Sequence, residues 1–248
     1  MDLIELPADD GAAEACLARP ESGSGPGVLL FMDAIGLRPR IQEMCDRIAG
    51  WGYVVLAPNV FYRDGTVAEI APRVDLREPG AREEFFAGAM PRVHGLTPDL
   101  SVPDIAAFVE HLRGLGGVAE GSIGTVGYCM GARLAVRAAT SHPALVAACA
   151  GFHGGGLVTD EQDSPHAGLA SARAEFVFGH ADQDPSMPPE AVAALGEALG
   201  AHGLTASNEV YPGAPHGYTM SDTSAYDEAA TERHFSELQA LLARVLPT

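Results

Sequence analysis

The stretch IGTVGYCMGARLAV, from Ile123 to Val136, changes from one kind of secondary structure to another around a single cysteine. Its first residues, Ile123–Val126, form a β-branched run that is typical of a buried strand. The later residues, Ala132–Ala139, have the apolar spacing of an amphipathic helix. Cys129 stands at the junction, so we expect a strand, a sharp turn and a helix with the cysteine at the turn.

This junction has the pattern of a nucleophile elbow. Gly127 and Gly131 flank Cys129 at two positions on either side, where steric crowding demands glycine. A thiol at a helix N-terminus lies near the positive end of the helix dipole, which lowers its pKa from about 8.5. The backbone N–H of Met130 in the same turn can donate to an oxyanion. The motif therefore predicts Cys129 as a nucleophile.

A thiol nucleophile works with a histidine base that a carboxylate orients, and in this architecture the acid and then the histidine follow the nucleophile in the chain. His216 lies in the loop PGAPHGYT after an expected strand, so we predict it as the base. Asp182 and Asp184 both follow the strand AEFVFG. Asp184 directly precedes the turn into the next helix and is favoured as the acid. Asp182 remains the alternative, and the aspartate not used would form a turn or cap a helix.

Along the rest of the chain, short apolar runs alternate with segments of helical periodicity. The expected strands are 13–17, 28–32, 53–57, 122–127, 145–152, 174–179 and 205–211, and the expected helices are 38–49, 100–112, 130–141, 189–200 and 222–246. The alternation predicts an α/β fold, a mostly parallel doubly wound sheet with helices on both faces. The two earliest strands are expected to form an antiparallel edge. Residues 61–98 and 154–171 break the pattern and are expected to be loops or caps near the strand ends.

The composition predicts one soluble globular domain that spans residues 1–248. Hydrophobic residues make up 47% of the chain and charged residues 19%, which is enough material for a buried core. The 33 acidic residues against 15 basic ones give a formal charge of −18. This charge would repel nucleic acid and anionic membranes, so we expect a small-molecule partner.

Three further patterns exclude other classes of protein. The four cysteines show no CxxC pair and no Cys/His spacing of a zinc site, so we expect neither disulfides nor a metal. The glycine-rich stretch 113–124 follows a helix rather than opening one, so no dinucleotide cofactor is expected. The N-terminus lacks the pattern of a signal peptide, and no stretch approaches about 18 apolar residues. We therefore expect a cytoplasmic protein that binds no cofactor and no membrane.

Five segments together resemble the dienelactone hydrolase family, a cysteine-using branch of the α/β-hydrolase superfamily. They are FMDAIGL (31–37), GWGYVVLAPNVFYR (50–63), GYCMG (127–131), DPSMP (184–188) and HGYT (216–219). The likeness spans nearly the whole chain and implies an α/β-hydrolase fold. By this resemblance Cys129, Asp184 and His216 form a catalytic triad. The backbone N–H groups of Ala34 and Met130 would donate to the oxyanion.

The chain departs from the family's pattern where substrate binds. Asp33 stands where the best-known members have a glutamate, and by the resemblance this shorter acid is expected among the substrate-binding residues, where it can still poise the thiol of Cys129. Met220 stands where those members have an arginine that binds a substrate carboxylate. Arg82 resembles the family's other carboxylate-binding arginine. With at most half of this clamp kept, a dienelactone acid is one candidate among several esters and lactones.

We therefore expect a hydrolase of a small-molecule ester or lactone, either a monomer or a homodimer. A class I glutamine amidotransferase also uses GxCxG and a later histidine, but Tyr218 stands where that family places a glutamate. The alternative from another class is a catalytically silent binding protein of hydrolase fold, in which Cys129 is redox-sensitive or merely retained.

Overall fold

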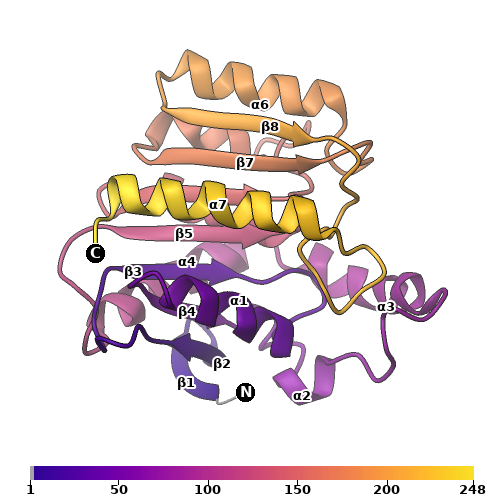
Figure 1. The fold of residues 1–248 in the computed structure, drawn as a ribbon, viewed down its shortest axis with the longest axis horizontal. Coiled ribbons are helices and arrows are strands. Elements are labelled where there is room, and N and C mark those ends of the chain that lie inside the picture. The colour runs from indigo at the N-terminus through magenta and orange to yellow at the C-terminus, as the bar shows by residue number, and fades with distance from the viewer. Residues whose placement is uncertain (1–2) are drawn as a thin grey trace.

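The computed structural model describes residues 3–248 and contains one eight-stranded sheet. Its strand order is β1-β2-β4-β3-β5-β6-β7-β8 (Figure 1). The strands are β1 (Leu3–Ala8), β2 (Gly11–Ala18), β3 (Gly27–Phe31), β4 (Val54–Pro58), β5 (Ile123–Tyr128), β6 (Val146–Phe152), β7 (Glu175–Ala181) and β8 (Ala206–Tyr211). Every residue of β3, β4 and β5 is buried, because helices cover both faces of these central strands.

The strand directions correct one expectation. The pairs from β4 through β8 are parallel, whereas β2 runs antiparallel to both β1 and β4. The expected strand 28–32 is β3 and lies inside the parallel part, so assigning it to the antiparallel edge was wrong. The edge is instead made by β2 together with β1, a strand that the sequence did not indicate. Pro7 obscures β1 in the sequence, but proline is tolerated on an edge strand because it lacks only an outward-facing donor.

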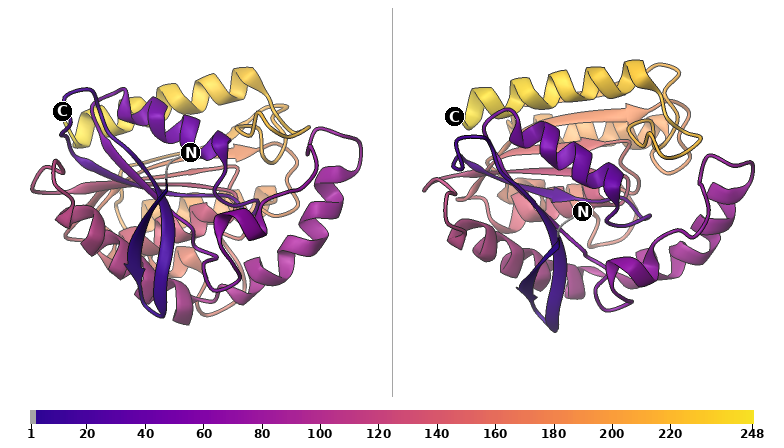
Figure 2. Two further views of the ribbon diagram at one scale, coloured as in Figure 1. Left: turned by 90° about the horizontal axis from the view of Figure 1, so that it is seen from below. Right: turned by 60° about the horizontal axis from the view of Figure 1, so that its bottom comes forward.

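Helices cover both faces of the sheet, which confirms the expected α/β architecture. They are α1 (Pro39–Ala49), α2 (Val67–Ile70), α3 (Ala81–Gly95), α4 (Pro98–Gly114), α5 (Gly131–Ser141), α6 (Pro189–Ala201) and α7 (Glu228–Val245), with a 3-10 helix, η1 (Pro165–Ser171). Helices α1 and α7 pack on one face, and α4, α5 and α6 on the other (Figure 2). Helix α7 begins later than expected because the Asp227 side chain caps it by accepting from the Ala230 N–H.

The two segments expected to be loops or caps contain helices, of which α3 has 15 residues. Residues 61–98 hold α2 and α3, and residues 154–171 end in η1. Helix α3 projects beyond the carboxyl ends of the parallel strands (Figure 1). It buries only Ala89 and Val93, so its sequence has no apolar stripe that would predict a helix. This location makes α3 a cap at the edge of the sheet where connecting loops gather.

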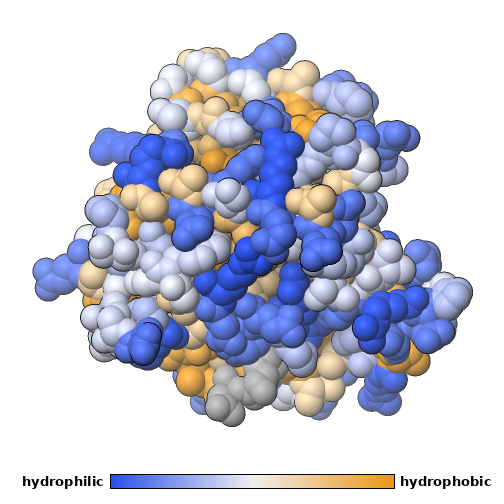
Figure 3. Space-filling model, viewed as in Figure 1, coloured by the Kyte–Doolittle hydropathy of each residue, from blue (hydrophilic) through white to orange (hydrophobic). Residues whose placement is uncertain are grey.

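The surface is mainly hydrophilic on the face shown in Figure 3, and apolar side chains are scattered among the hydrophilic ones. Within residues 3–248, none of the helices combines the length and the apolar character that crossing a membrane requires.

The loops that follow β3, β5, β7 and β8 all leave the sheet at the carboxyl ends of parallel strands. In an open α/β sheet, this edge is where binding sites form. The five segments that carry the resemblance include the loops after β3, β5, β7 and β8. The topology therefore brings residues from positions near 33, 129, 184 and 216 to one place.

Candidate active site

The turn between β5 and α5 has the geometry that the sequence predicted for the elbow. Cys129 adopts a positive φ of 54°, which is uncommon for a residue with a side chain. A Cβ at Gly127 would lie 2.1 Å from the Gly131 carbonyl oxygen, and a Cβ at Gly131 would lie 2.4 Å from that of Phe31. Both positions therefore require glycine. The turn presents Cys129, half-buried, at the start of α5.

The structure brings Cys129, His216 and Asp184 together. The Cys129 thiol is hydrogen-bonded to His216. On the other side of the ring, His216 Nδ1 lies 2.6 Å from Asp184 Oδ2. Asp182 is not part of this series, because its Oδ2 accepts from the Gly213 N–H at 2.8 Å. Asp182 thus stabilises the turn before the histidine loop, and Asp184 is the carboxylate beside His216.

Ser186 supports Asp184, a contact that sequence reasoning missed. Both its backbone N–H and its hydroxyl donate to Asp184 Oδ1, at 2.9 and 2.7 Å. The other oxygen of Asp184 is left for His216. A serine two residues after an aspartate is a known turn pattern, so the DPSMP segment contained a signal for this contact.

The three groups shift one another's pKa values. Burial raises the pKa of the Cys129 thiol, but the charge and hydrogen bond of His216 outweigh it and the pKa falls below its ordinary value. Burial disfavours the imidazolium, yet the Cys129 thiolate and Asp184 raise the pKa of His216 to about 10. Burial likewise opposes ionised Asp184, but hydrogen bonds from His216 and Ser186 lower its pKa. The site therefore favours a thiolate beside an imidazolium over a neutral thiol beside a neutral imidazole.

The two residues whose backbone N–H groups are expected at the oxyanion site both line one cavity beside Cys129. Ala34 follows β3 and Met130 precedes α5. The Met130 N–H hydrogen-bonds the Cys129 side chain. The Ala34 carbonyl accepts from Arg92 Nη2 of α3 at 2.9 Å, which fixes the loop at this residue. Arg92 was not singled out from the sequence, because nothing local links it to a loop 58 residues away.

Asp33 lies beside the site, but its carboxylate is held by Arg38. Arg38 Nη1 donates to Asp33 Oδ1 at 2.7 Å and Nη2 donates to Oδ2 at 3.0 Å. Arg38 also pairs with Asp222 and contacts the Met220 sulfur. The charge of Asp33 raises the pKa of Cys129 and so opposes His216. Asp33 lines only a small space next to Cys129, outside the wall of the larger cavity.

The larger cavity has a volume of about 600 Å³ and is closed on one side by α3. Arg82 lies in its wall, as expected of a substrate-binding residue, and donates to the His216 carbonyl at 3.1 Å. Its guanidinium also packs over the Phe86 ring. The lining residues contributed by α3 are Arg82, Glu83, Phe86, Met90, Val93 and His94. The cavity thus combines an apolar wall with the polar groups of Cys129, His216 and Asp184.

His153 is a buried residue whose imidazole ring lies next to that of His216. Its backbone has a positive φ of 38°, and its Nε2 lies 2.7 Å from the Thr219 hydroxyl. The two imidazole rings are 5.4 Å apart. Burial and the charge of His216 lower the pKa of His153 well below its ordinary value, so it stays neutral. Within residues 3–248, no group of three or more His, Cys, Asp or Glu side chains is arranged to hold a metal ion.

Comparisons with known proteins find matches over nearly the whole chain. The family model described as "Dienelactone hydrolase family" matches residues 13–246. Two relatives are each 26% identical to this chain: the "Putative carboxymethylenebutenolidase" of Methylorubrum extorquens, covering 95% of this chain and 78% of its own length, and "Carboxymethylenebutenolidase 1" of Cupriavidus pinatubonensis, covering 93% and 91%.

A solved structure shows the same fold. The "Putative Dienelactone Hydrolase" of Klebsiella pneumoniae matches with a TM-score of 0.79 and 22% identity, over 98% of each chain. This likeness establishes the α/β-hydrolase fold. The family match extends from β2 into the segment after α7. The chain therefore belongs to the dienelactone hydrolase family.

Proposed function

We propose that this protein hydrolyses a carboxylic ester or lactone through an acyl-enzyme on Cys129. The observation that carries the proposal is the hydrogen-bonded series from Cys129 through His216 to Asp184 at a cavity of about 600 Å³. A thiolate held at a strand-to-helix turn, with an imidazole on one side and backbone N–H groups nearby, is suited to attack on a carbonyl carbon.

In the first step, the Cys129 sulfur attacks the carbonyl carbon and the carbonyl oxygen becomes an oxyanion. The Ala34 and Met130 N–H groups stabilise that charge. The intermediate then collapses to a thioester, and the leaving oxygen takes a proton from His216. Asp184 keeps the His216 ring oriented and stabilises its positive charge.

In the second step, His216 removes a proton from water, and the resulting hydroxide attacks the thioester carbonyl. The Cys129 thiolate leaves, and the acid product is released. Two relatives are named carboxymethylenebutenolidases, and enol lactones have good leaving groups, so a dienelactone-type lactone is a candidate substrate. A reactive thiolate persists in a reducing compartment, and we propose the cytoplasm as the location.

Replacing the nucleophile tests this proposal. Cys129→Ala should lower kcat for 4-nitrophenyl acetate by at least about a thousandfold. Cys129→Ser should also lose most activity, because a serine hydroxyl does not form the ion pair with His216. The matched control is Cys149→Ala, which removes a buried cysteine of the neighbouring strand β6 and should stay active. Wild-type rates in both Cys129 variants would refute the assignment, as would absence of a thioester adduct on Cys129 during turnover.

A further inference from the structure

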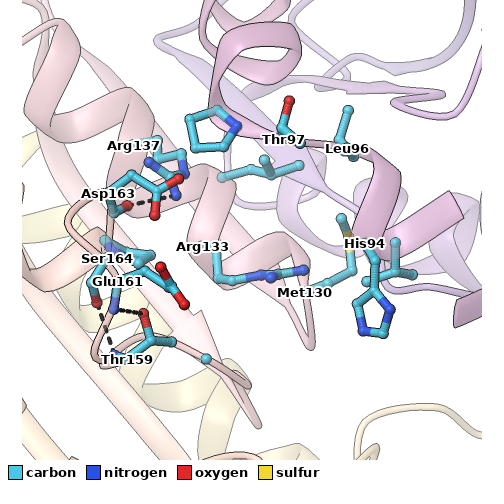
Figure 4. A pocket seen from close by; sticks show the side chains of 15 residues that line it. His94, Leu96, Thr97, Met130, Arg133, Arg137, Thr159, Glu161, Asp163 and Ser164 are labelled. Atoms are coloured by element: carbon cyan, nitrogen blue, oxygen red, sulfur yellow. Dashed lines mark hydrogen bonds between the residues drawn. The ribbon is translucent and has the colours of Figure 1, made fainter. Parts of the chain in front are cut away.

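Arg133 lies in the first turn of α5, four residues after Cys129. It lines the cavity that contains Cys129 and also a neighbouring cavity of about 470 Å³. The residues shared by the two cavities are Val93, His94, Met130, Arg133 and Gly156. Arg133 therefore lies in the wall that the Cys129 cavity shares with the second cavity, whose lining residues Figure 4 shows.

Among residues 3–248 the guanidinium of Arg133 makes no hydrogen bond and no ion pair with a carboxylate, and the anionic group near it is the Cys129 thiolate. The other arginines near these cavities are engaged: Arg82, Arg92 and Arg137 each donate to a backbone carbonyl. Burial lowers the pKa of Arg133 and the charge of the Cys129 thiolate offsets this only in part, so the guanidinium charge is poorly solvated. A partly buried cation with five unused N–H donors is stabilised by an anionic partner.

The direction of the side chain indicates where that partner would lie. Figure 4 shows Arg133 extended across the cavity toward His94, with its guanidinium directed away from Glu161 and Asp163. These two acidic residues line the far wall of the second cavity. Their charges would repel a dianion such as a phosphate monoester more strongly than a singly charged group. The site therefore fits a carboxylate better than a phosphate.

We propose that Arg133 binds a carboxylate of the substrate and selects esters or lactones whose negative charge lies several bonds from the scissile carbonyl. The proposal rests on the hydrolase function proposed above, because it names the substrate class of the same cavity. Arg133 acts as a binding residue: it pairs with the remote carboxylate while Cys129 attacks the carbonyl. Bidentate pairing with a planar carboxylate is the geometry for which a guanidinium is best suited.

A matched pair of substrates tests the proposal. Mono-4-nitrophenyl adipate and 4-nitrophenyl hexanoate have the same chain length and leaving group, and differ by a terminal carboxylate or methyl. We expect the wild type to prefer the adipate ester, and Arg133→Met to lower kcat/KM for it by at least about tenfold. The hexanoate ester should change by less than about twofold, and Arg133→Lys should restore part of the preference.

Neighbouring arginines provide the controls. Arg137→Met removes a cation one turn further along α5 that lines only the second cavity, and should retain the preference for adipate. Arg82→Met tests the other arginine of the active cavity. Loss of the preference in Arg82→Met but not in Arg133→Met would overturn the proposal. So would an equal loss on both esters in Arg133→Met, since Arg133 would then act on the thiolate or the fold.

A binding measurement separates this inference from the proposed hydrolysis. In the Cys129→Ala background, which cannot form the acyl-enzyme, calorimetric titration with monomethyl adipate should give about tenfold weaker binding when Arg133→Met is added. Methyl hexanoate should bind both proteins equally. If the wild type cleaves neither ester but this difference is found, the hydrolase proposal fails and the carboxylate site stands. Equal binding of monomethyl adipate to both proteins would refute the carboxylate site.

Discussion

His216 lies between two groups that both favour its protonated form, the Cys129 thiolate and the Asp184 carboxylate. Its pKa of about 10 and the lowered pKa of Cys129 both result from the ion pair between the two groups. Burial opposes both charges, and the pair forms because each charge compensates for the other. Each group thus favours the charged form of the other, so His216 promotes ionisation of the Cys129 thiol.

Removing His216 should reverse the pKa shift of Cys129. In His216→Ala, burial and the Asp33 charge remain, and both raise the pKa of the thiol. Iodoacetamide alkylation of Cys129 should therefore stay fast to lower pH in the wild type than in the variant. The rates are measured by mass spectrometry of the Cys129 peptide across the pH range. Superimposable pH profiles would contradict the ion pair.

Ser186 should act on the reaction chiefly through Asp184, to which its hydroxyl is closer than to His216 Nδ1, 2.7 against 3.4 Å. Ser186→Ala removes the 2.7 Å hydroxyl hydrogen bond to Oδ1 but keeps the one from the backbone. Because these bonds lower the pKa of Asp184, the acid limb of the pH dependence of kcat/KM should move to higher pH. We expect a loss of about tenfold or less in kcat. Ser186→Thr keeps a hydroxyl and should return the acid limb of kcat/KM to its wild-type pH. If Ser186→Ala leaves the acid limb at its wild-type pH, this positioning role is excluded.

Some elements could be predicted because their signals are local, and others could not. The strand, turn and helix around Cys129 were predictable because two glycines and a change of hydrophobic period occur within a few residues. Helix α3 was missed because it covers a cavity rather than a core, so its sequence carries no apolar stripe. Strand β1 was missed because Pro7 argues against a strand unless its edge position is known.

Gly131, one of the two elbow glycines, allows α5 to pack closely against β3, and this can be tested. Gly131→Ala would place a Cβ 2.4 Å from the Phe31 carbonyl oxygen, so α5 must move away from β3. The variant should have a clearly lower Tm or fail to fold. The matched control is Gly200→Ala in α6, where a Cβ would meet nothing within 4 Å. That change should raise stability by about 0.5–1 kcal/mol, because alanine favours the helix. Equal Tm shifts in thermal unfolding monitored by circular dichroism would refute the steric argument.

At the scale of the whole molecule, the candidate site is assembled by the order of the parallel strands. The loops after β5, β7 and β8 carry Cys129, Asp184 and His216, and that chain order allowed all three to be predicted from sequence. The pairing of Arg38 with Asp222 could not be predicted, because the two residues are 184 positions apart and nothing local marks them. Such contacts depend on where loops meet, which only the folded chain determines.

Arg38 should therefore be important for both stability and reactivity. It is buried and joins the loop after β3 to the loop before α7 through Asp33 and Asp222. Arg38→Met leaves the buried Asp33 carboxylate without its cation, which typically costs about 3–5 kcal/mol. We expect a Tm lower by several degrees or more, together with a higher pKa of the Cys129 thiol because the Asp33 charge is no longer neutralised.

The double variant Arg38→Met/Asp33→Asn distinguishes an unpaired charge from lost packing. It removes both charges, so it should recover much of the Tm and bring the pKa of Cys129 back down. Arg77→Met is the surface control, since Arg77 pairs with Asp75 in solvent and its loss should barely change the Tm. Thermal unfolding and the pH dependence of Cys129 alkylation measure the two effects in the same proteins. Breaking a buried ion pair should leave an uncompensated charge in the interior and so lower the Tm. If Arg38→Met lowers the Tm no more than Arg77→Met does, the buried ion pair does not hold the two loops together.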